Sequence, residues 1–141
     1  MNILLAVDGS PFTKKMLAYL AAHEELITPA HHRYTVLTVQ PALPVRARAA
    51  LSKDMVDAYY QEEFDRVLGP VCKFLAQSGI TPSTRTEVGA AGETIAQIAQ
   101  AGKFDLIVMG THGHNALGKL VMGSVSTQVL AQCSVPVMLI R

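Results

Sequence analysis

The sequence predicts an α/β protein with an open, doubly wound, five-stranded parallel sheet and helices on both faces. Continuous apolar runs, typical of strands buried on both faces, alternate with segments of helical periodicity. Strands that alternate with crossover helices form parallel sheets. No internal repeat interrupts the alternation, and 141 residues suit a single domain over 1–141.

The N-terminal segment is expected to form a strand and a helix. Residues 2–7 (NILLAV) are an unbroken apolar run, which predicts a buried strand. Ser10 is a plausible helix cap, and Pro11 suits the first helical turn. Apolar residues at helical spacing continue to about Ile27, and Thr28-Pro29 ends the pattern.

The next part of the chain predicts a second strand, a loop and a long helix. Residues 33–40 (RYTVLTVQ) are rich in β-branched side chains, as strands are. Residues 41–50 contain two prolines and two arginines and predict a loop. Helical spacing then extends over about 51–77, with a kink or break expected at Gly69-Pro70. The predicted apolar stripe is Met55, Tyr59, Phe64, Val67, Leu68, Val71 and Leu75.

Turn residues then separate the remaining elements. Ser78-Gly79 is a helix stop, and residues 82–88 alternate weakly, as an edge or near-edge strand would. Residues 89–92 predict a turn, and residues 93–101 a short helix closed by Gly102.

The C-terminal segment predicts two further strands around one helix. Residues 105–109 (DLIVM) indicate a buried strand, and residues 110–123 a loop punctuated by glycines. Residues 124–132 follow as a helix. Residues 135–140 indicate the last strand, in which a proline favours an exposed edge or an unusual pairing partner.

Composition and charge exclude several classes of protein. Half of the residues are hydrophobic and 16% are charged, which argues against disorder. The net charge of +1 gives no broad attraction to nucleic acid or anionic lipid. No apolar run is long enough to span a membrane, and the N-terminus resembles a strand more than a signal peptide. Two distant cysteines, Cys72 and Cys133, fit free thiols in a reducing compartment, so a cytoplasmic location is expected.

Two predicted strand ends contain unusual chemistry. Ligands of open α/β sheets bind outside the carboxyl ends of the strands, where the strand order reverses. The first predicted strand ends in Val7-Asp8-Gly9-Ser10, and the fourth in Met109-Gly110-Thr111-His112-Gly113. On local sequence alone, Asp8 either caps the next helix or accepts hydrogen bonds from a ligand. If both strands adjoin the reversal point, their ends form one binding region.

The glycine spacing after the fourth strand predicts a phosphate site. Gly110 and Gly113 follow a buried strand, and after nine intervening residues Gly123-Ser124 opens the next helix. Glycines allow close approach of a ligand or a positive φ, and a helix N-terminus offers free N–H groups to phosphate. The Ser124 hydroxyl either donates to a phosphate or caps its own helix. The pattern is neither a P-loop nor a dinucleotide-binding G-x-G-x-x-G motif.

This spacing, G-x-x-G, nine residues and G-S, resembles the ATP-binding motif of the universal stress protein family. The opening Val7-Asp8-Gly9-Ser10 and the final Val135–Arg141 segment are also similar, so the resemblance covers essentially the whole chain; residues 41–80 diverge most. It implies an adenine nucleotide alpha hydrolase-like sandwich with strand order 3-2-1-4-5. It also implies binding of ATP, or of AMP or ADP, with Mg²⁺ held mainly by the phosphates.

The resemblance assigns roles to individual residues. Asp8, with Ala6 and Val7 nearby, would face the ribose and base, and the Val39 backbone would recognise adenine. Met109 and Gly110 would lie against the ribose. The phosphates would be held by Gly113, Gly123, Ser124 and Val125.

Several basic or titratable residues have alternative roles. His114 stands where the family often has Arg or Lys, which lowers the charge offered to phosphate. At least one of His112 and His114 is expected to contact the ligand, in preference to a metal site built on the H-x-H pair, which lacks nearby partner ligands. Lys119, Arg46 and Arg48 either reach the phosphates or are solvated loop charges.

Three functions remain open from the sequence. The first is a non-enzymatic, ATP-binding regulatory or stress-response protein. The second is an interaction module that does not use nucleotide. The third is a slow ATP hydrolase, although no base or arginine finger is evident and no catalytic residue is assigned. Residues Val135–Ile140 form an apolar edge strand, and the resemblance implies a homodimer through it.

Overall fold

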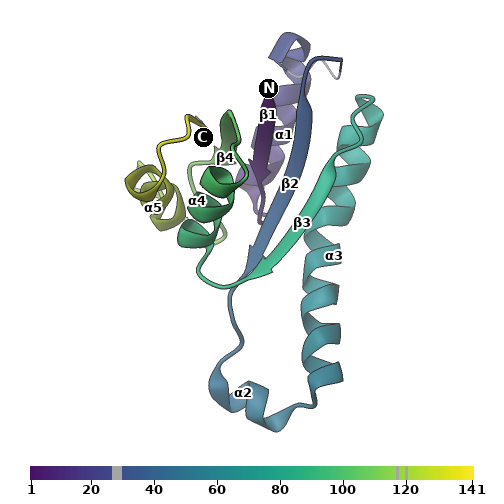
Figure 1. The fold of residues 1–141 in the computed structure, drawn as a ribbon, viewed down its shortest axis with the longest axis vertical. Coiled ribbons are helices and arrows are strands. Elements are labelled where there is room, and N and C mark those ends of the chain that lie inside the picture. The colour runs from purple at the N-terminus through teal and green to yellow at the C-terminus, as the bar shows by residue number, and fades with distance from the viewer. Residues whose placement is uncertain (27–29, 117, 120) are drawn as a thin grey trace.

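The computed structural model describes residues 1–26, 30–116, 118–119 and 121–141, which form a five-stranded parallel sheet flanked by helices (Figure 1). The order β3-β2-β1-β4-β5 confirms the predicted fold class and strand order. The strands are β1 (Asn2–Ala6), β2 (Arg33–Gln40), β3 (Ser83–Val88), β4 (Leu106–Gly110) and β5 (Val137–Ile140). The helices are α1 (Pro11–Ala22), α2 (Val45–Ala50), α3 (Lys53–Gln77), α4 (Ala91–Ala101) and α5 (Ser124–Gln132), with a 3-10 helix at Glu24–Leu26.

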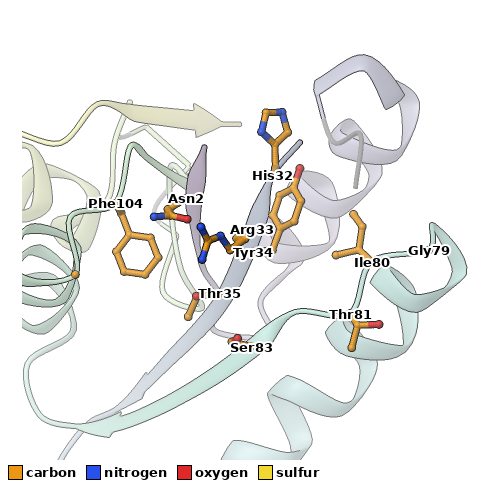
Figure 2. Close-up of a pocket in the computed structure, with 11 residues that line it drawn as sticks. Asn2, His32, Arg33, Tyr34, Thr35, Gly79, Ile80, Thr81, Ser83 and Phe104 are labelled. Atoms are coloured by element: carbon orange, nitrogen blue, oxygen red, sulfur yellow. The ribbon is translucent and has the colours of Figure 1, made fainter. Parts of the chain in front are cut away.

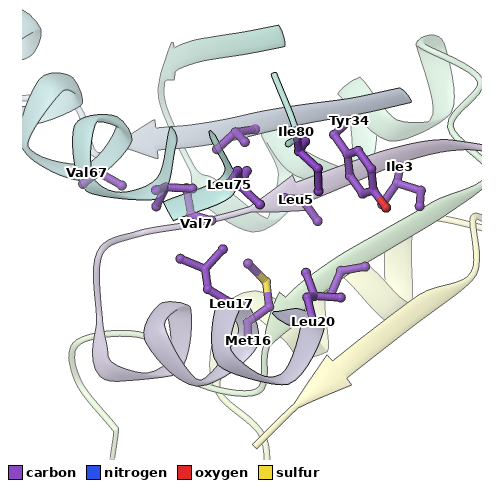
Figure 3. Packing of buried hydrophobic residues seen from close by; sticks show 13 residues of the cluster. Ile3, Leu5, Val7, Met16, Leu17, Leu20, Tyr34, Val67, Leu75 and Ile80 are labelled. Carbon is purple, nitrogen blue, oxygen red and sulfur yellow. The ribbon is translucent and has the colours of Figure 1, made fainter. Parts of the chain in front are cut away.

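The central strands β1, β2 and β4 are buried on both faces, because successive strand residues point to opposite sides and helices cover each side. On one face, Leu5 and Val7 pack with residues of α1 and α3, among them Met16 and Leu75 (Figure 3). The opposite face packs against α4 and α5. Its buried residues are Leu4, Ala6, Leu37, Ile95, Ile98, Ala99, Ile107, Met109 and Val129. These two cores explain why β1 and β4 are almost entirely apolar in the sequence.

Helix α1 is shorter than predicted, because it ends at Ala22 rather than near Ile27. His23 has a non-helical backbone (φ −125°, ψ 68°), and its ring stacks on Tyr19. Its Nδ1 lies 2.8 Å from the Tyr19 carbonyl oxygen, which a continuing helix would use to accept the His23 amide. That amide donates to the Leu20 carbonyl instead. The predicted stop at residues 28–29 lies outside the described residues.

The segment 41–50, predicted to be a loop, contains helix α2. Both prolines precede the helix, at Pro41 and at the N-cap position Pro44, so neither interrupts it. The helical residues VRARAA are mainly alanine and arginine, which have high helix propensity. The presence of proline near the segment therefore misled the prediction.

Helix α3 is continuous, whereas Gly69-Pro70 predicted a kink or a break. Pro70 removes one N–H donor, and both residues of this pair are exposed, so water can hydrate the carbonyl left free. From Phe64 onwards the predicted apolar stripe is buried except at Leu68, which is half-buried. Met55 and Tyr59 are 56% and 42% exposed because this end of α3 extends beyond the sheet (Figure 1).

Helix α4 begins at Ala91, so Gly92 lies inside the helix and not in the predicted turn. A Cβ at Gly92 would overlap the side chain of Gln128 in α5. This glycine therefore lets α4 and α5 approach each other closely.

Strand β5 is an edge strand and begins at Val137, two residues later than predicted. Pro136 precedes it, and the Pro136 carbonyl accepts the Ile107 amide of β4. The missing proline N–H thus interrupts no pairing. At the other edge, β3 is largely exposed, as its weak alternation predicts.

Candidate functional site

The carboxyl ends of β1 and β4 lie side by side. Ala6 pairs with Met109 on one side of β1 and with Leu37 on the other, so the strand order reverses at β1. Ala6, Val7 and Met109 are buried in the sheet core, which fixes the backbone that follows them. The two segments singled out in the sequence therefore meet at the reversal point.

Asp8 is held in place by three hydrogen bonds directly after β1. Its Oδ1 accepts the Ser10 amide at 2.9 Å and the Thr13 hydroxyl at 3.1 Å, and its own amide donates to Thr13 Oγ1 at 3.1 Å. Ser10 lies at the N-cap position of α1, but its hydroxyl caps nothing and is buried without a partner among the described residues, contrary to the prediction. Asp8 therefore orders the turn that begins α1 and leaves Oδ2 for other contacts.

The loop after β4 folds back onto Asp8. A Cβ at Gly113 would lie 2.7 Å from Asp8 Oδ2, so only glycine fits against the carboxylate here. His114 Nε2 lies 2.7 Å from the Asp8 carbonyl oxygen, and the His114 side chain is otherwise exposed. His112 Nδ1 lies 2.9 Å from Thr111 Oγ1. Two separate contacts thus join this loop to the end of β1.

Close packing explains the other glycines of this region. A Cβ at Gly110 would lie 2.6 Å from Phe12 Cβ, and one at Gly123 would lie 3.1 Å from the Thr111 carbonyl oxygen. None of Gly110, Gly113 and Gly123 has positive φ, in contrast to Gly9 (φ 75°). The three loop glycines are therefore required by close packing against the chain itself, and the close approach of a ligand stays a prediction.

Helix α5 begins at Ser124 and presents free amides to the same region. Gly123 is its N-cap residue, and no side chain caps it. The Gly123 amide is already used, because it donates to the Thr111 carbonyl at 2.7 Å. The amides of Ser124 and Val125 have no acceptor among the described residues. Both amides point out of the helix N-terminus, where the helix dipole favours an anion.

The Val39 backbone also faces the end of β1. The Leu37 carbonyl accepts the Val7 amide, so it points to the β1 side of β2. The Gln40 carbonyl accepts the Gly89 amide, so it points to the β3 side. Residues two apart on a parallel strand direct their N–H and C=O groups to the same side. The N–H and C=O of Val39 therefore point toward the segment after β1, and no hydrogen bond joins them to its described residues.

Several supporting residues were not predicted. Phe12 lies under Gly110 with its ring centroid 5.0 Å from that of His112, and Thr13 holds Asp8. Ser126 is buried, and its hydroxyl donates to the Thr111 carbonyl at 2.8 Å. A hydroxyl in the first turn of a helix is a recognisable capping signal, but its partner in another segment is not visible in the sequence.

The basic residues considered in the sequence lie on exposed segments. Arg46 and Arg48 are exposed on α2, and Lys119 is exposed in the loop before α5. Within the part of the chain that the structure describes, no group of three His, Cys, Asp or Glu residues is arranged to hold a metal ion. The same part contains no helix with the length and apolar character needed to cross a membrane.

Comparisons with known proteins agree with this architecture. A universal stress protein of Thermus aquaticus is 33% identical over 145 residues, covering 99% of this chain and 98% of the relative. A Synechocystis universal stress protein is 30% identical over 140 residues, and this chain spans 42% of that longer protein.

Solved structures show the same fold. A universal stress protein from Lactobacillus plantarum superposes with a TM-score of 0.75 at 26% identity, covering 100% of this chain and 97% of the other. The Methanocaldococcus jannaschii protein MJ0577 superposes with a TM-score of 0.82 at 23% identity, covering 99% and 94%. The model of the universal stress protein family matches residues 1–141, and the chain therefore belongs to this family.

Proposed function

We propose that this protein binds an adenine nucleotide where β1, β4 and α5 meet, and that it acts as a stress-response or regulatory binding module in the cytoplasm. The main support is that Asp8, Gly113 and the free amides of Ser124 and Val125 belong to three segments that converge at the carboxyl edge of the sheet. Such an arrangement offers an acceptor for ribose hydroxyls beside donors for phosphate.

Each part of the nucleotide has a partner of suitable chemistry. The free N–H and C=O of Val39 suit the adenine edge, which presents one acceptor and one donor. Asp8 Oδ2 suits a ribose hydroxyl, because Oδ1 is already engaged. The Ser124 and Val125 amides, with the Ser124 hydroxyl, suit the phosphates. The proposed contact set is Ala6, Val7, Asp8, Val39, Met109, Gly110, His112, Gly113, His114, Gly123, Ser124 and Val125.

Two structurally similar proteins are described with adenine nucleotides. One is a universal stress protein family protein from Arabidopsis thaliana described with AMP bound, with a TM-score of 0.65 and 17% identity. The other is a universal stress protein in complex with cAMP, with a TM-score of 0.60 and 20% identity. At these identities the likeness shows the fold alone, so the nucleotide of this protein is inferred from its own residues.

The contact between Gly113 and Asp8 implies that the loop moves when nucleotide binds. A ribose at Asp8 Oδ2 needs the space that Gly113 borders, and the His114 contact with the Asp8 carbonyl holds the loop there. Because the loop contains imidazoles rather than Arg or Lys beside Gly113, the phosphates would rely on amides and on Mg²⁺ bound by the phosphates themselves.

Isothermal titration calorimetry with ATP, ADP and AMP, each with and without Mg²⁺, tests this proposal. We expect saturable binding of at least one nucleotide, weakened about tenfold by Asp8→Asn, since a hydrogen bond to a charged group is lost. Asn keeps an oxygen acceptor for Ser10 and Thr13, so the turn should persist. Gly113→Val should abolish binding, and Gly118→Val is the matched control, because a Cβ at Gly118 meets nothing within 4 Å. No binding by the wild-type protein would refute the proposal.

We also propose a homodimer through β5. The residues of β5 are all half-buried, and one side of this edge strand is unpaired within the described chain. A second copy can pair with it antiparallel across a two-fold axis. Sedimentation at micromolar concentration should give a dimer, and Leu139→Lys should shift it to monomer. A wild-type monomer would contradict the proposal.

A further inference from the structure

A hollow of about 470 Å³ lies at the amino edge of the sheet, opposite the carboxyl edge described above (Figure 2). Strand and helix ends form it together. Its lining residues are Asn2, His32, Arg33, Tyr34, Thr35, Gly79, Ile80, Thr81, Ser83, Gly102 and Phe104. A second hollow of about 420 Å³ shares Asn2, His32 and Arg33, so the two adjoin along the start of β2.

The strand register explains why this part of the sheet is uncovered. Pairing of β2 with β3 begins only at Thr35 and Ser83, so Arg33 precedes the first paired residue. Arg33, Thr35 and Ser83 lie on the face toward α4, because side chains alternate along a strand. The buried residues of α4 pack on β1, β2 and β4, and β3 stays exposed. The amino ends of β2 and β3 are therefore uncovered, and Gly102 and Phe104, directly after α4, form one side of the hollow.

Arg33 gives this hollow a positive charge that no short ion pair with a described residue neutralises. Two nearby arginines do form short ion pairs. Arg66 in α3 pairs with Glu63 at 2.8 Å, and Arg85 in β3 pairs with Glu87 at 3.0 Å. Arg33 has no such partner among the described residues, and no Asp or Glu lines the 470 Å³ hollow. In the adjoining hollow, Asp105 accepts the Asn2 amide at 2.7 Å.

Hydroxyl groups and an aromatic ring complete the lining. Thr35, Thr81 and Ser83 add hydroxyl groups to the lining. Figure 2 shows Arg33 and Asn2 on the same side of the sheet as the Phe104 ring. A Cβ at Gly102 would lie 2.6 Å from this ring, so Gly102 lets the ring lie against the end of α4. The hollow thus combines a cation, neutral donors and one apolar wall.

We propose that this hollow binds a small organic oxyanion with a flat apolar body. The planar guanidinium of Arg33 pairs with the carboxylate or phosphate group in two parallel hydrogen bonds, and hydroxyls of Thr35 and Ser83 bind the remaining oxygens. The apolar body lies on Phe104. The site is independent of the nucleotide region, since it uses the amino ends of β2 and β3.

Amide chemical-shift titrations with benzoate and with inorganic phosphate test this proposal, with sodium chloride at equal ionic strength as the reference. We expect saturable shifts at Thr35, Ser83 and Phe104. Arg33→Gln should weaken binding about tenfold, because a charged hydrogen-bond donor is lost. Arg85→Gln should leave it unchanged, since Arg85 lies on the same face but already pairs with Glu87. The proposal would be overturned if benzoate and phosphate gave the same shifts as sodium chloride. It would also be overturned if the wild-type protein and Arg33→Gln gave the same shifts with these ligands.

A second variant separates the two halves of the ligand. Phe104→Leu keeps an apolar residue but removes the ring, so it should weaken benzoate and leave phosphate unchanged. Equal weakening of both would contradict the apolar contact. Saturable shifts confined to Ser124 and Val125 would assign the oxyanion to the nucleotide region and refute this site.

Discussion

Replacing Gly113 with alanine should destabilise the protein by disturbing Asp8. The added Cβ would lie 2.7 Å from Asp8 Oδ2, and the φ of Gly113 is not positive, so contact rather than backbone strain sets the cost. The carboxylate can retreat only by weakening its bonds from the Ser10 amide (2.9 Å) and the Thr13 hydroxyl (3.1 Å). Hydrogen bonds to charged groups contribute about 1.5–3 kcal/mol each. Partial loss of both should cost about 1–3 kcal/mol.

Thermal unfolding by calorimetry measures this cost. In a domain of this size the melting temperature falls by about 2–4 °C per kcal/mol, so we expect a decrease of roughly 2–12 °C. Gly118→Ala is the control in the same loop, because its Cβ would meet nothing within 4 Å. In an Asp8→Ala background the effect of Gly113→Ala should disappear. Equal destabilisation with and without the carboxylate would refute the reasoning.

Four further substitutions test the packing and the burial of single residues. An added Cβ at Gly69, which is exposed in α3, would meet nothing within 4 Å, so Gly69→Ala should raise the free energy of unfolding by about 0.5–1 kcal/mol. An added Cβ at Gly92 would overlap the Gln128 side chain, so Gly92→Ala should lower it by about 1–3 kcal/mol. Urea titrations measure both changes. Leu75→Ala, at a residue 1% exposed, should cost about 2–5 kcal/mol, and a cost below 1 kcal/mol would contradict its core position. Burial raises the pKa of Tyr34 above 10.0, because the charged phenolate is poorly solvated in the core. The stability that neutral Tyr34 contributes is therefore complete below about pH 10 and is lost as the pH rises through the folded-state pKa. Tyr34→Phe should therefore flatten the alkaline decrease of the urea midpoint, and an unchanged slope would exclude this cause.

The sheet could be predicted because its signals are local. Residues 33–40 form β2 as predicted, and residues 124–132 form α5, since β-branched runs and a glycine-serine helix start are unambiguous. The errors occur where tertiary contacts decide. Gly92 lies in a helix that packs closely on α5, and at the early end of α1 the His23 ring contacts the Tyr19 carbonyl. Such partners are distant or depend on side-chain geometry.

The candidate site follows the same division. The glycine spacing and Asp8 were recognisable in the sequence, but the way they meet was not. The use of the Gly123 amide by Thr111, and the contact of His114 with the Asp8 carbonyl, arise from the path of the loop in three dimensions. The free groups of Val39 follow from the point at which β1 ends.

Comparison of ATP with adenosine by amide chemical shifts tests the nucleotide proposal most directly. If the start of α5 binds phosphate, ATP should shift the Ser124 and Val125 amides downfield, while adenosine should shift only residues near Val39 and Asp8. Identical shifts of Ser124 and Val125 with both compounds, or none with ATP, would show that these amides bind no phosphate.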